Sequence, residues 1–330
     1  MLKLVECVPN FSEGRDKNII NAISNEITET ADVKLLDVDP GFDTNRTVVT
    51  FIGTPDGVKE AAFKAIKKAA QLIDMRKHIG AHARMGATDV CPFVPVSGVS
   101  TEECIKLAEE LGQRVADELD IPVYLYEEAA TRPERRNLAD IRSGEYEGLP
   151  EKLKDPDWTP DFGKAEFNAN SGATVIGVRE FLIAYNVNLN TKDRKLANDI
   201  ALTIRERGRL KRDEEGKVVR DENGTALRVP GLLNSCKAVG WYIDEYGQAQ
   251  ISMNLVNYKN TPPHVAFDTI CAEAEKRGLR VTGSELVGLI PLKAVLDAGV
   301  YYLTKQGKST AVPEEELIDI AIKSLGLNDI

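Results

Sequence analysis

The sequence predicts an α/β (α+β) protein built from two consecutive split βαβ units, each with a mostly antiparallel sheet and helices on one face. Short β-branched runs alternate with segments in which apolar residues recur every three or four positions. This order of elements occurs twice along the 330 residues, a length that suits about two domains. We therefore expect ferredoxin-like subdomains at 1–180 and 181–330.

The first half is assigned from its periodicity and its turn residues. Thr54 is placed to cap the second helix, and the turn sequence at 39–43 indicates that the strands on either side of it form a hairpin. Strands are expected at Leu2–Val8, Val33–Val38, Arg46–Ile52, Val90–Val96 and Pro122–Tyr126, and helices at Lys17–Ile27, Pro55–Ile73 and Thr101–Leu119.

The second half repeats this pattern after a long connection at 131–162, which either wraps the surface or lines a site. The segment 208–228 is polar and charged, so we expect an exposed insertion there. A hairpin is expected through 243–248. Strands are expected at Phe181–Leu189, Leu232–Tyr242, Ala249–Val256 and Leu279–Gly283, and helices at Thr191–Arg207 (capped by Thr191), at Thr261–Gly278 and towards the C-terminus.

Composition excludes several classes of protein. The net charge of −10 argues against a nucleic-acid coat, and no apolar run approaches the roughly 20 residues that cross a bilayer. The N-terminus lacks the form of a signal peptide, and the five cysteines include no C-x-x-C pair. Phosphate-loop and dinucleotide-binding motifs are absent, so no nucleotide is expected. We expect a cytoplasmic protein with reduced thiols and with no nucleic-acid or membrane partner.

The segment 75–92 carries the strongest signal for chemistry, because it places histidines among glycines and basic residues between a helix and a strand. His82 is either an acid/base catalyst or a loop histidine that only forms structural hydrogen bonds. Arg84 nearby is suited to binding a carboxylate. His78 lies four residues before His82, a spacing that on a helix suits a metal. The glycines disfavour a helix there, and no H-E-x-x-H pattern occurs, so no metal is expected.

Three further features have both a structural and a functional interpretation. Asp39 at a strand end is either a turn residue or a carboxylate that orients a histidine, and Arg46 is a possible salt-bridge partner for it. The small and amide residues of 163–174 form either an inert loop or a ligand-lining strand and turn between the domains. Glu285 lies in an almost apolar run, where a buried carboxylate would need a partner.

Separated blocks along almost the whole chain resemble one family, the glutamate formimidoyltransferases. The first carries Val5-Glu6-Cys7-Val8-Pro9-Asn10-Phe11-Ser12-Glu13-Gly14-Arg15, and the second carries Leu36-Asp37-Val38-Asp39-Pro40-Gly41 with Thr44-Asn45-Arg46-Thr47-Val48. The histidine block is 80–95, and further blocks lie at 172–177, 181–186 and 284–292. Six blocks in the same order make this resemblance highly specific.

The resemblance implies transfer of the formimidoyl group from N-formimidoyl-L-glutamate to tetrahydrofolate, a late step of histidine degradation. It also implies ferredoxin-like subdomains, a homodimer and a folate-binding crevice, with tetrahydrofolate as co-substrate. His82 matches the family's catalytic histidine, and Asp39 matches a carboxylate that assists it. The folate-contacting stretch corresponds to Gly163, Lys164, Ala165, Glu166, Phe167, Asn168, Ala169, Asn170, Ser171 and Gly172.

The chemistry of this transfer fits the residues. One neutral histidine can take the proton of the attacking ring amine and return it to the departing glutamate nitrogen. Both substrates carry carboxylates, which assigns Arg46 and Arg84 to substrate binding. Ala83 stands where the family usually has proline. The alternatives are a related transferase that acts on formyl-glutamate or formyl-folate, and a non-catalytic folate-binding protein. The cyclodeaminase domain fused in animal proteins is not matched, so we expect the product to pass to a separate enzyme.

Overall fold

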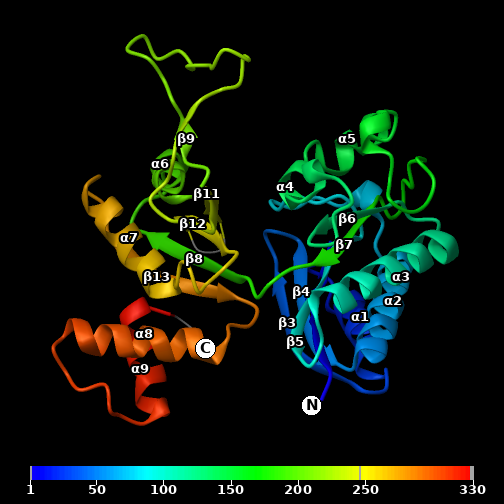
Figure 1. Cartoon of the computed structure of the whole chain (residues 1–330), viewed down its shortest axis with the longest axis horizontal. Coiled ribbons are helices and arrows are strands. Elements are labelled where there is room, and N and C mark those ends of the chain that lie inside the picture. Colours follow the sequence, from blue (N-terminus) through cyan, green and yellow to red (C-terminus); the bar gives the residue numbers. More distant parts are fainter. Residues whose placement is uncertain (1, 245–246, 328–330) are drawn as a thin grey trace. The chain divides into compact units, whose positions relative to one another are not determined.

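The computed structural model describes residues 2–244 and 247–327 (Figure 1). The chain forms two compact units, residues 1–180 and 181–330, each with its own core. Both units combine helices with sheets in which most strand pairs are antiparallel, so the predicted α+β fold class is confirmed. The turn expected through 243–248 includes residues 245–246, which lie outside the described residues.

The N-terminal unit is built on a sheet with the strand order β1-β4-β2-β5-β7-β6, and β3 pairs with β4 at the edge of this path. The pairs β5–β7 and β6–β7 are parallel, and the other pairs are antiparallel. The strands are β1 (Leu4–Cys7), β2 (Asn10–Phe11), β3 (Val33–Gly41), β4 (Arg46–Gly53), β5 (Thr88–Ser97), β6 (Val123–Glu127) and β7 (Thr174–Val178).

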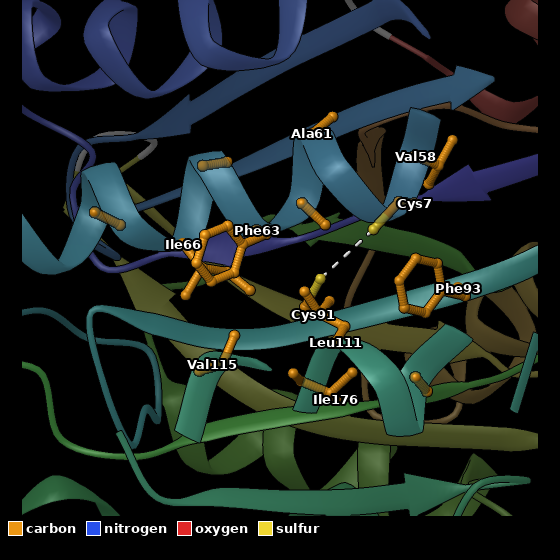
Figure 2. Packing of buried hydrophobic residues seen from close by; sticks show 14 of the residues in the cluster. Cys7, Val58, Ala61, Phe63, Ile66, Cys91, Phe93, Leu111, Val115 and Ile176 are labelled. Carbon is orange, nitrogen blue, oxygen red and sulfur yellow. Dashed lines mark hydrogen bonds between the residues drawn. The ribbon is translucent and has the colours of Figure 1, made fainter. Parts of the chain in front are cut away.

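The three longer helices of this unit, α1 (Lys17–Thr28), α2 (Pro55–Leu72) and α3 (Thr101–Leu119), contribute to its main apolar core. Asp16, Thr54 and Ser100 cap their N-termini, and Ser100 forms a capping box with Glu103. Figure 2 shows part of this core, in which the sulfur atoms of Cys7 and Cys91 face each other at 3.5 Å. All five cysteines are free thiols.

The connection at 131–162 packs on the opposite face of β6. Side chains alternate along a strand, and accordingly Val123 and Leu125 belong to the main core whereas Tyr124 and Tyr126 belong to a second cluster. That cluster also contains Leu149. The connection carries η2 (Pro133–Arg135), α4 (Leu138–Ile141), α5 (Glu145–Lys152) and η3 (Pro156–Trp158), and η1 (Met75–Lys77) precedes it in the chain.

The C-terminal unit has a sheet with the order β11-β12-β8-β13, in which every pair is antiparallel. The segment expected as an insertion forms an exposed arm that begins with β9 and ends with β10 (Figure 1). The elements are β8 (Ile183–Leu189), α6 (Arg194–Ile204), β9 (Arg209–Leu210), β10 (Arg228–Val229), β11 (Cys236–Ile243), β12 (Gln248–Leu255), α7 (Pro263–Glu275), β13 (Val281–Val287), α8 (Leu292–Lys305) and α9 (Glu314–Leu325).

Several local expectations differ from the structure. β11 begins at Cys236 and not at Leu232, and β13 covers Val281–Val287 and not 279–283. β3 continues to Gly41, so Asp39 lies within a strand opposite Val48 and the turn falls at 42–45. α6 begins at Arg194 because Asp193 caps it, while the Thr191 hydroxyl accepts a bond from the Asp193 N–H. Strand β7 was not expected as a separate element. Within the described part of the chain, no helix has the length and apolar character needed to cross a membrane.

Candidate active site

The histidine loop, residues 75–87, is fastened to the β3–β4 hairpin by Asn45. Asn45 has a φ of 47° and its Nδ2 donates to the Ile79 carbonyl at 3.1 Å. The Asn45 carbonyl accepts a bond from His78 Nε2 at 2.8 Å. Gly80 passes so close to the hairpin that a Cβ there would lie 2.2 Å from the Thr44 carbonyl oxygen. The loop therefore depends on the hairpin for its position.

Arg46, the first residue of β4, reaches His82 directly. Its Nη1 lies 2.9 Å from His82 Nε2 and 2.9 Å from Asn10 Oδ1. Because a guanidinium only donates, Nε2 of His82 must carry the lone pair and the proton of the neutral ring resides on Nδ1. Nδ1 of His82 and Nε of Arg46 are buried without a hydrogen-bond partner in the described parts of the chain. Buried polar atoms are usually bonded, so these two mark a place where a ligand can supply the partner.

The surroundings of His82 hold its ring neutral. Burial, followed by the positive charges of Arg46 and Arg142, holds the pKa of His82 well below its usual range. Burial and Arg142 lower the pKa of Arg46 to about 10, against the opposing charges of Asp89 and Asp39. At neutral pH the site therefore combines a neutral imidazole with a charged guanidinium, a pairing suited to a base beside an anionic substrate.

Asp89 organises the opposite side of the loop. It is fully buried in β5, its Oδ1 accepts a bond from the Met85 N–H at 2.9 Å, and it forms an ion pair with Arg142 of the 131–162 connection. Sequence reasoning did not identify Asp89, Asn45 or Arg142 as site residues. An aspartate at the start of an otherwise apolar strand, two residues after Ala87, was the only signal for Asp89.

His78 and Arg84 have their polar atoms engaged within the protein. His78 Nε2 donates to Asn45, and its Nδ1 accepts from Arg84 Nε at 3.1 Å, so both ring nitrogens are used. The Arg84 guanidinium is nearly buried and binds Glu145 at 2.9 Å and Glu147 at 2.6 Å. A substrate carboxylate would have to displace one of these glutamates to reach Arg84.

Asp39 lies on the same sheet face as Arg46. Arg46 pairs with Gly41 in the hairpin register, and Asp39 lies two residues along β3 from Gly41, opposite Val48. Val49, the next residue of β4 after Val48, points into the core formed with α1 and α2. Asp39 and Arg46 therefore point to the opposite face of the sheet. Asp39 is thus positioned to act on Arg46 electrostatically, as its effect on the Arg46 pKa indicates.

The stretch 163–172 joins the histidine loop at its C-terminal end. The Ala87 N–H donates to the Ser171 carbonyl at 2.9 Å, and the Ala173 N–H donates to the Met85 carbonyl at 3.2 Å. Gly172 has a φ of 67°, and a Cβ there would lie 2.1 Å from the Met85 carbonyl oxygen. Only glycine meets both conditions without strain.

The first half of this stretch is exposed. Residues 163–167 are exposed, and the Phe167 ring lies 5.3 Å from the Tyr146 ring, between centroids. The Tyr146 hydroxyl donates to the Ala169 carbonyl, and its N–H donates to the Arg84 carbonyl. Tyr146 therefore connects the stretch to the histidine loop, and the Phe167 ring beside it is exposed. In the residues that the structure describes, no three His, Cys, Asp or Glu side chains group as a metal site.

Comparison with known proteins identifies the family of the chain. The model of the formiminotransferase domain, N-terminal subdomain, matches residues 4–179, and that of the formiminotransferase domain matches residues 184–330. The glutamate formimidoyltransferase of Streptococcus pyogenes serotype M1 is 42% identical over 303 residues, which cover 92% of this chain and 94% of that protein.

Longer relatives also match. The formimidoyltransferase-cyclodeaminases of Dictyostelium discoideum and Rattus norvegicus are 51% and 50% identical over 99% and 100% of this chain. The chain spans 58% of the length of each of these two proteins. Together the two family models cover nearly the whole chain, and the chain belongs to the formiminotransferase family.

Proposed function

We propose that the protein transfers the formimidoyl group from N-formimidoyl-L-glutamate to tetrahydrofolate, giving formimidoyl-tetrahydrofolate and L-glutamate in histidine degradation. Membership of the formiminotransferase family supports this reaction. The observation that carries the proposal is the buried, neutral His82 in contact with Arg46, in a loop whose Ala87 is bonded to Ser171 of the stretch 163–172.

His82 acts as the general acid/base. The ring amine of tetrahydrofolate attacks the amidine carbon, and a C–N bond forms while the proton of the amine passes to His82. The bond between the amidine carbon and the glutamate nitrogen then breaks, and His82 returns the proton to that nitrogen. One proton is moved, and the imidazole ends as it began. A depressed pKa suits the first step, because the ring is neutral at neutral pH.

Arg46 binds a substrate carboxylate and thereby frees the base. In the structure its Nη1 occupies the lone pair of His82 Nε2. A carboxylate that draws the guanidinium towards itself removes this hydrogen bond, so the base becomes available when the substrate is bound. Asp39 supports the positive charge of Arg46 and stabilises the amidinium that develops in the transition state.

The stretch 163–172 binds the folate. Its exposed first half, with Phe167 beside Tyr146, offers a flat apolar surface. Arg84 binds the second carboxylate by exchange with Glu145 or Glu147. We further propose a cytoplasmic homodimer that uses tetrahydrofolate as co-substrate, needs neither metal nor nucleotide, and has no nucleic-acid or membrane partner.

A parallel assay with two donors tests the reaction. The purified protein is incubated with formimidoyl-glutamate or with formyl-glutamate, each with and without tetrahydrofolate, and free glutamate is measured. We expect release of glutamate only with formimidoyl-glutamate and tetrahydrofolate together. If glutamate is released from formyl-glutamate but not from formimidoyl-glutamate, the protein is the related formyl transferase instead. Tight folate binding without turnover of either donor would identify a folate-binding protein.

A further inference from the structure

Glu285 lies on a polar face of the C-terminal sheet that the proposed function does not use. Residues of β8 and β12 alternate strictly, so Tyr185, Val187 and Ile251 pack into the helical core. The residues between them point to the other face. That face carries Asn186 and Asn188 of β8, Gln250 and Ser252 of β12, Trp241 of β11 and Glu285 of β13.

The strand register arranges these side chains in two neighbouring rows. One row runs directly across the strands from Trp241 to Gln250 to Asn188, and it ends at Gly283, which has no side chain. The next row contains Ser252, Asn186 and Glu285. Because Gly283 leaves its position open, the Glu285 carboxylate reaches Asn188 and Gln250 in the first row.

Hydrogen bonds run in one direction along the first row towards Glu285. Trp241 Nε1 donates to Gln250 Oε1 at 3.0 Å, and Gln250 Nε2 donates to Asn188 Oδ1 at 2.7 Å. Asn188 Nδ2 donates to Glu285 Oε1 at 3.0 Å, and Gln250 Nε2 lies 3.2 Å from both carboxylate oxygens. Bonds in such a chain polarise one another, so the row stabilises the negative charge of Glu285.

The carboxylate nevertheless has no counter-charge. Only neutral amides contact it, and it takes part in no ion pair within the residues that the structure describes. A carboxylate has about four acceptor positions, and the two amides leave part of this capacity unused, mainly on Oε2. Since Glu285 is half-buried, a ligand can still reach it.

Asn186 provides an independent indication of a ligand. It lies directly opposite Glu285 and is only 6% exposed, yet its carboxamide makes no hydrogen bond inside the described ranges. Its polar atoms are not among the fully buried atoms without a partner, so they remain open to a ligand. An N–H donor without a partner therefore lies beside a carboxylate without a cation, on one face of one sheet.

We propose that this face binds the edge of a planar heterocycle that offers two adjacent N–H groups to Glu285 and one carbonyl oxygen to Asn186. The 2-amino-4-oxo edge of the pteridine ring has this pattern, so the inference rests on the folate substrate of the proposed function. Two parallel bonds to a carboxylate are strong and directional. The amidine of formimidoyl-glutamate offers N–H groups too, but the oxygen nearest to them belongs to its α-carboxylate, whose negative charge would lie beside that of Glu285.

The test compares two ligands on the full chain by calorimetry, folic acid and its analogue with a methyl group in place of the 2-amino group. We expect the wild type to prefer folic acid about tenfold or more, as for a lost bond to a charged group. In Glu285→Gln the side-chain oxygen can still accept from Asn188, so the fold is retained. We expect its preference to fall to about twofold or less, because the ligand then meets an amide without charge.

Two control variants keep the result specific. Glu275→Gln makes the same chemical change at an exposed position of α7 and should keep the wild-type preference. His82→Ala should also keep it, since the preference reports binding and not transfer. A preference that survives in Glu285→Gln overturns the inference and leaves the proposed transfer intact. A higher KM for formimidoyl-glutamate with an unchanged preference also overturns it and assigns Glu285 to the donor. Full preference in a wild type without transfer activity would refute the proposed reaction alone.

Discussion

The histidine loop of the N-terminal unit and the polar face of the C-terminal sheet organise polar groups by different means. Gly80 of the loop and Gly172 of the adjoining stretch allow the backbone to approach a neighbouring segment closely, and single side chains such as Asn45 hold the loop in place. On the sheet face, strand register places Gln250 and Asn188 side by side. A loop of this kind can shape a pocket around a reacting group, but it depends on a few contacts. The strand register of a sheet is held by many backbone hydrogen bonds, so a single substitution disturbs it less.

The largest effect should come from removing the imidazole in the loop. We expect His82→Ala to lower kcat/KM for formimidoyl transfer by about 10²- to 10⁴-fold, the range for loss of a general acid/base. Circular dichroism should show an unchanged fold. His264→Gln, a histidine in α7 of the other unit, is the matched control and should retain activity. Near-wild-type transfer by folded His82→Ala would remove the chemistry from the loop.

The second effect concerns the charge beside the base. Arg46→Gln removes a positive charge that lowers the pKa of His82, so that pKa should rise towards the usual value. A base is lost as pH falls through its pKa, and the acid limb of the kcat/KM profile should therefore move to higher pH. The lost carboxylate contact should cost about ten- to a hundredfold in kcat/KM.

Arg136→Gln is the control for this change, because Arg136 is exposed and pairs only with Glu128 among the ion pairs of the described residues. Its pH profile should match that of the wild type. An acid limb that stays in place in Arg46→Gln would show that Arg46 does not tune His82.

The third effect distinguishes the cost of a positive φ from the cost of a steric clash where the histidine loop meets the stretch 163–172. Gly172→Ala places a Cβ 2.1 Å from a carbonyl oxygen at a φ of 67°. Gly278→Ala has a similar φ of 69°, but a Cβ there would meet no atom within 4 Å. Each variant should lose about 1 kcal/mol from the left-handed backbone, and Gly172→Ala should lose about 1–3 kcal/mol more. Equal losses in urea unfolding would contradict the close packing of 85–87 against 171–173.

The smallest effect should come from the sheet face. Trp241→Phe removes the indole N–H that donates to Gln250 but keeps most of the ring. We expect unfolding to become easier by about 1 kcal/mol, with little change in kcat. A loss as large as that of Gly172→Ala would show that the register of the sheet also depends on single contacts.

The sequence predicted well where local signals are complete. The helix expected at Thr101–Leu119 was confirmed, and the structure adds that Ser100 and Glu103 form a capping box just before its amphipathic run. Thr54 was correctly assigned as the cap of α2. The β3–β4 hairpin was also confirmed, although Pro40 and Gly41 suggested a turn where the strand continues. Pairing of Pro40 with Thr47 and of Gly41 with Arg46 keeps these two residues in the strand despite their preference for turns.

The features that the sequence did not predict depend on contacts between residues far apart in the chain. β7 pairs in parallel with β5 and β6, so no hairpin turn joins it to either partner, and its pairing is not marked in the local sequence. The contact between Arg46 and His82 joins positions 36 residues apart, and the binding of Arg84 by Glu145 and Glu147 joins positions 61 and 63 apart. Residue types suggested that these side chains carry chemistry, but no spacing could identify their partners. The catalytic and binding roles of these residues remain predictions.

The buried thiols also provide a way to follow each unit as it opens. Cys7 and Cys91, labelled in Figure 2, and Cys104 are buried in the N-terminal unit, and Cys236 is buried in the C-terminal unit. An alkylating reagent can modify them only when the surrounding structure opens, so mass-spectrometric labelling rates report local unfolding free energies. Because these cysteines are distributed over both halves of the chain, one labelling experiment can determine whether the two units unfold together or in sequence.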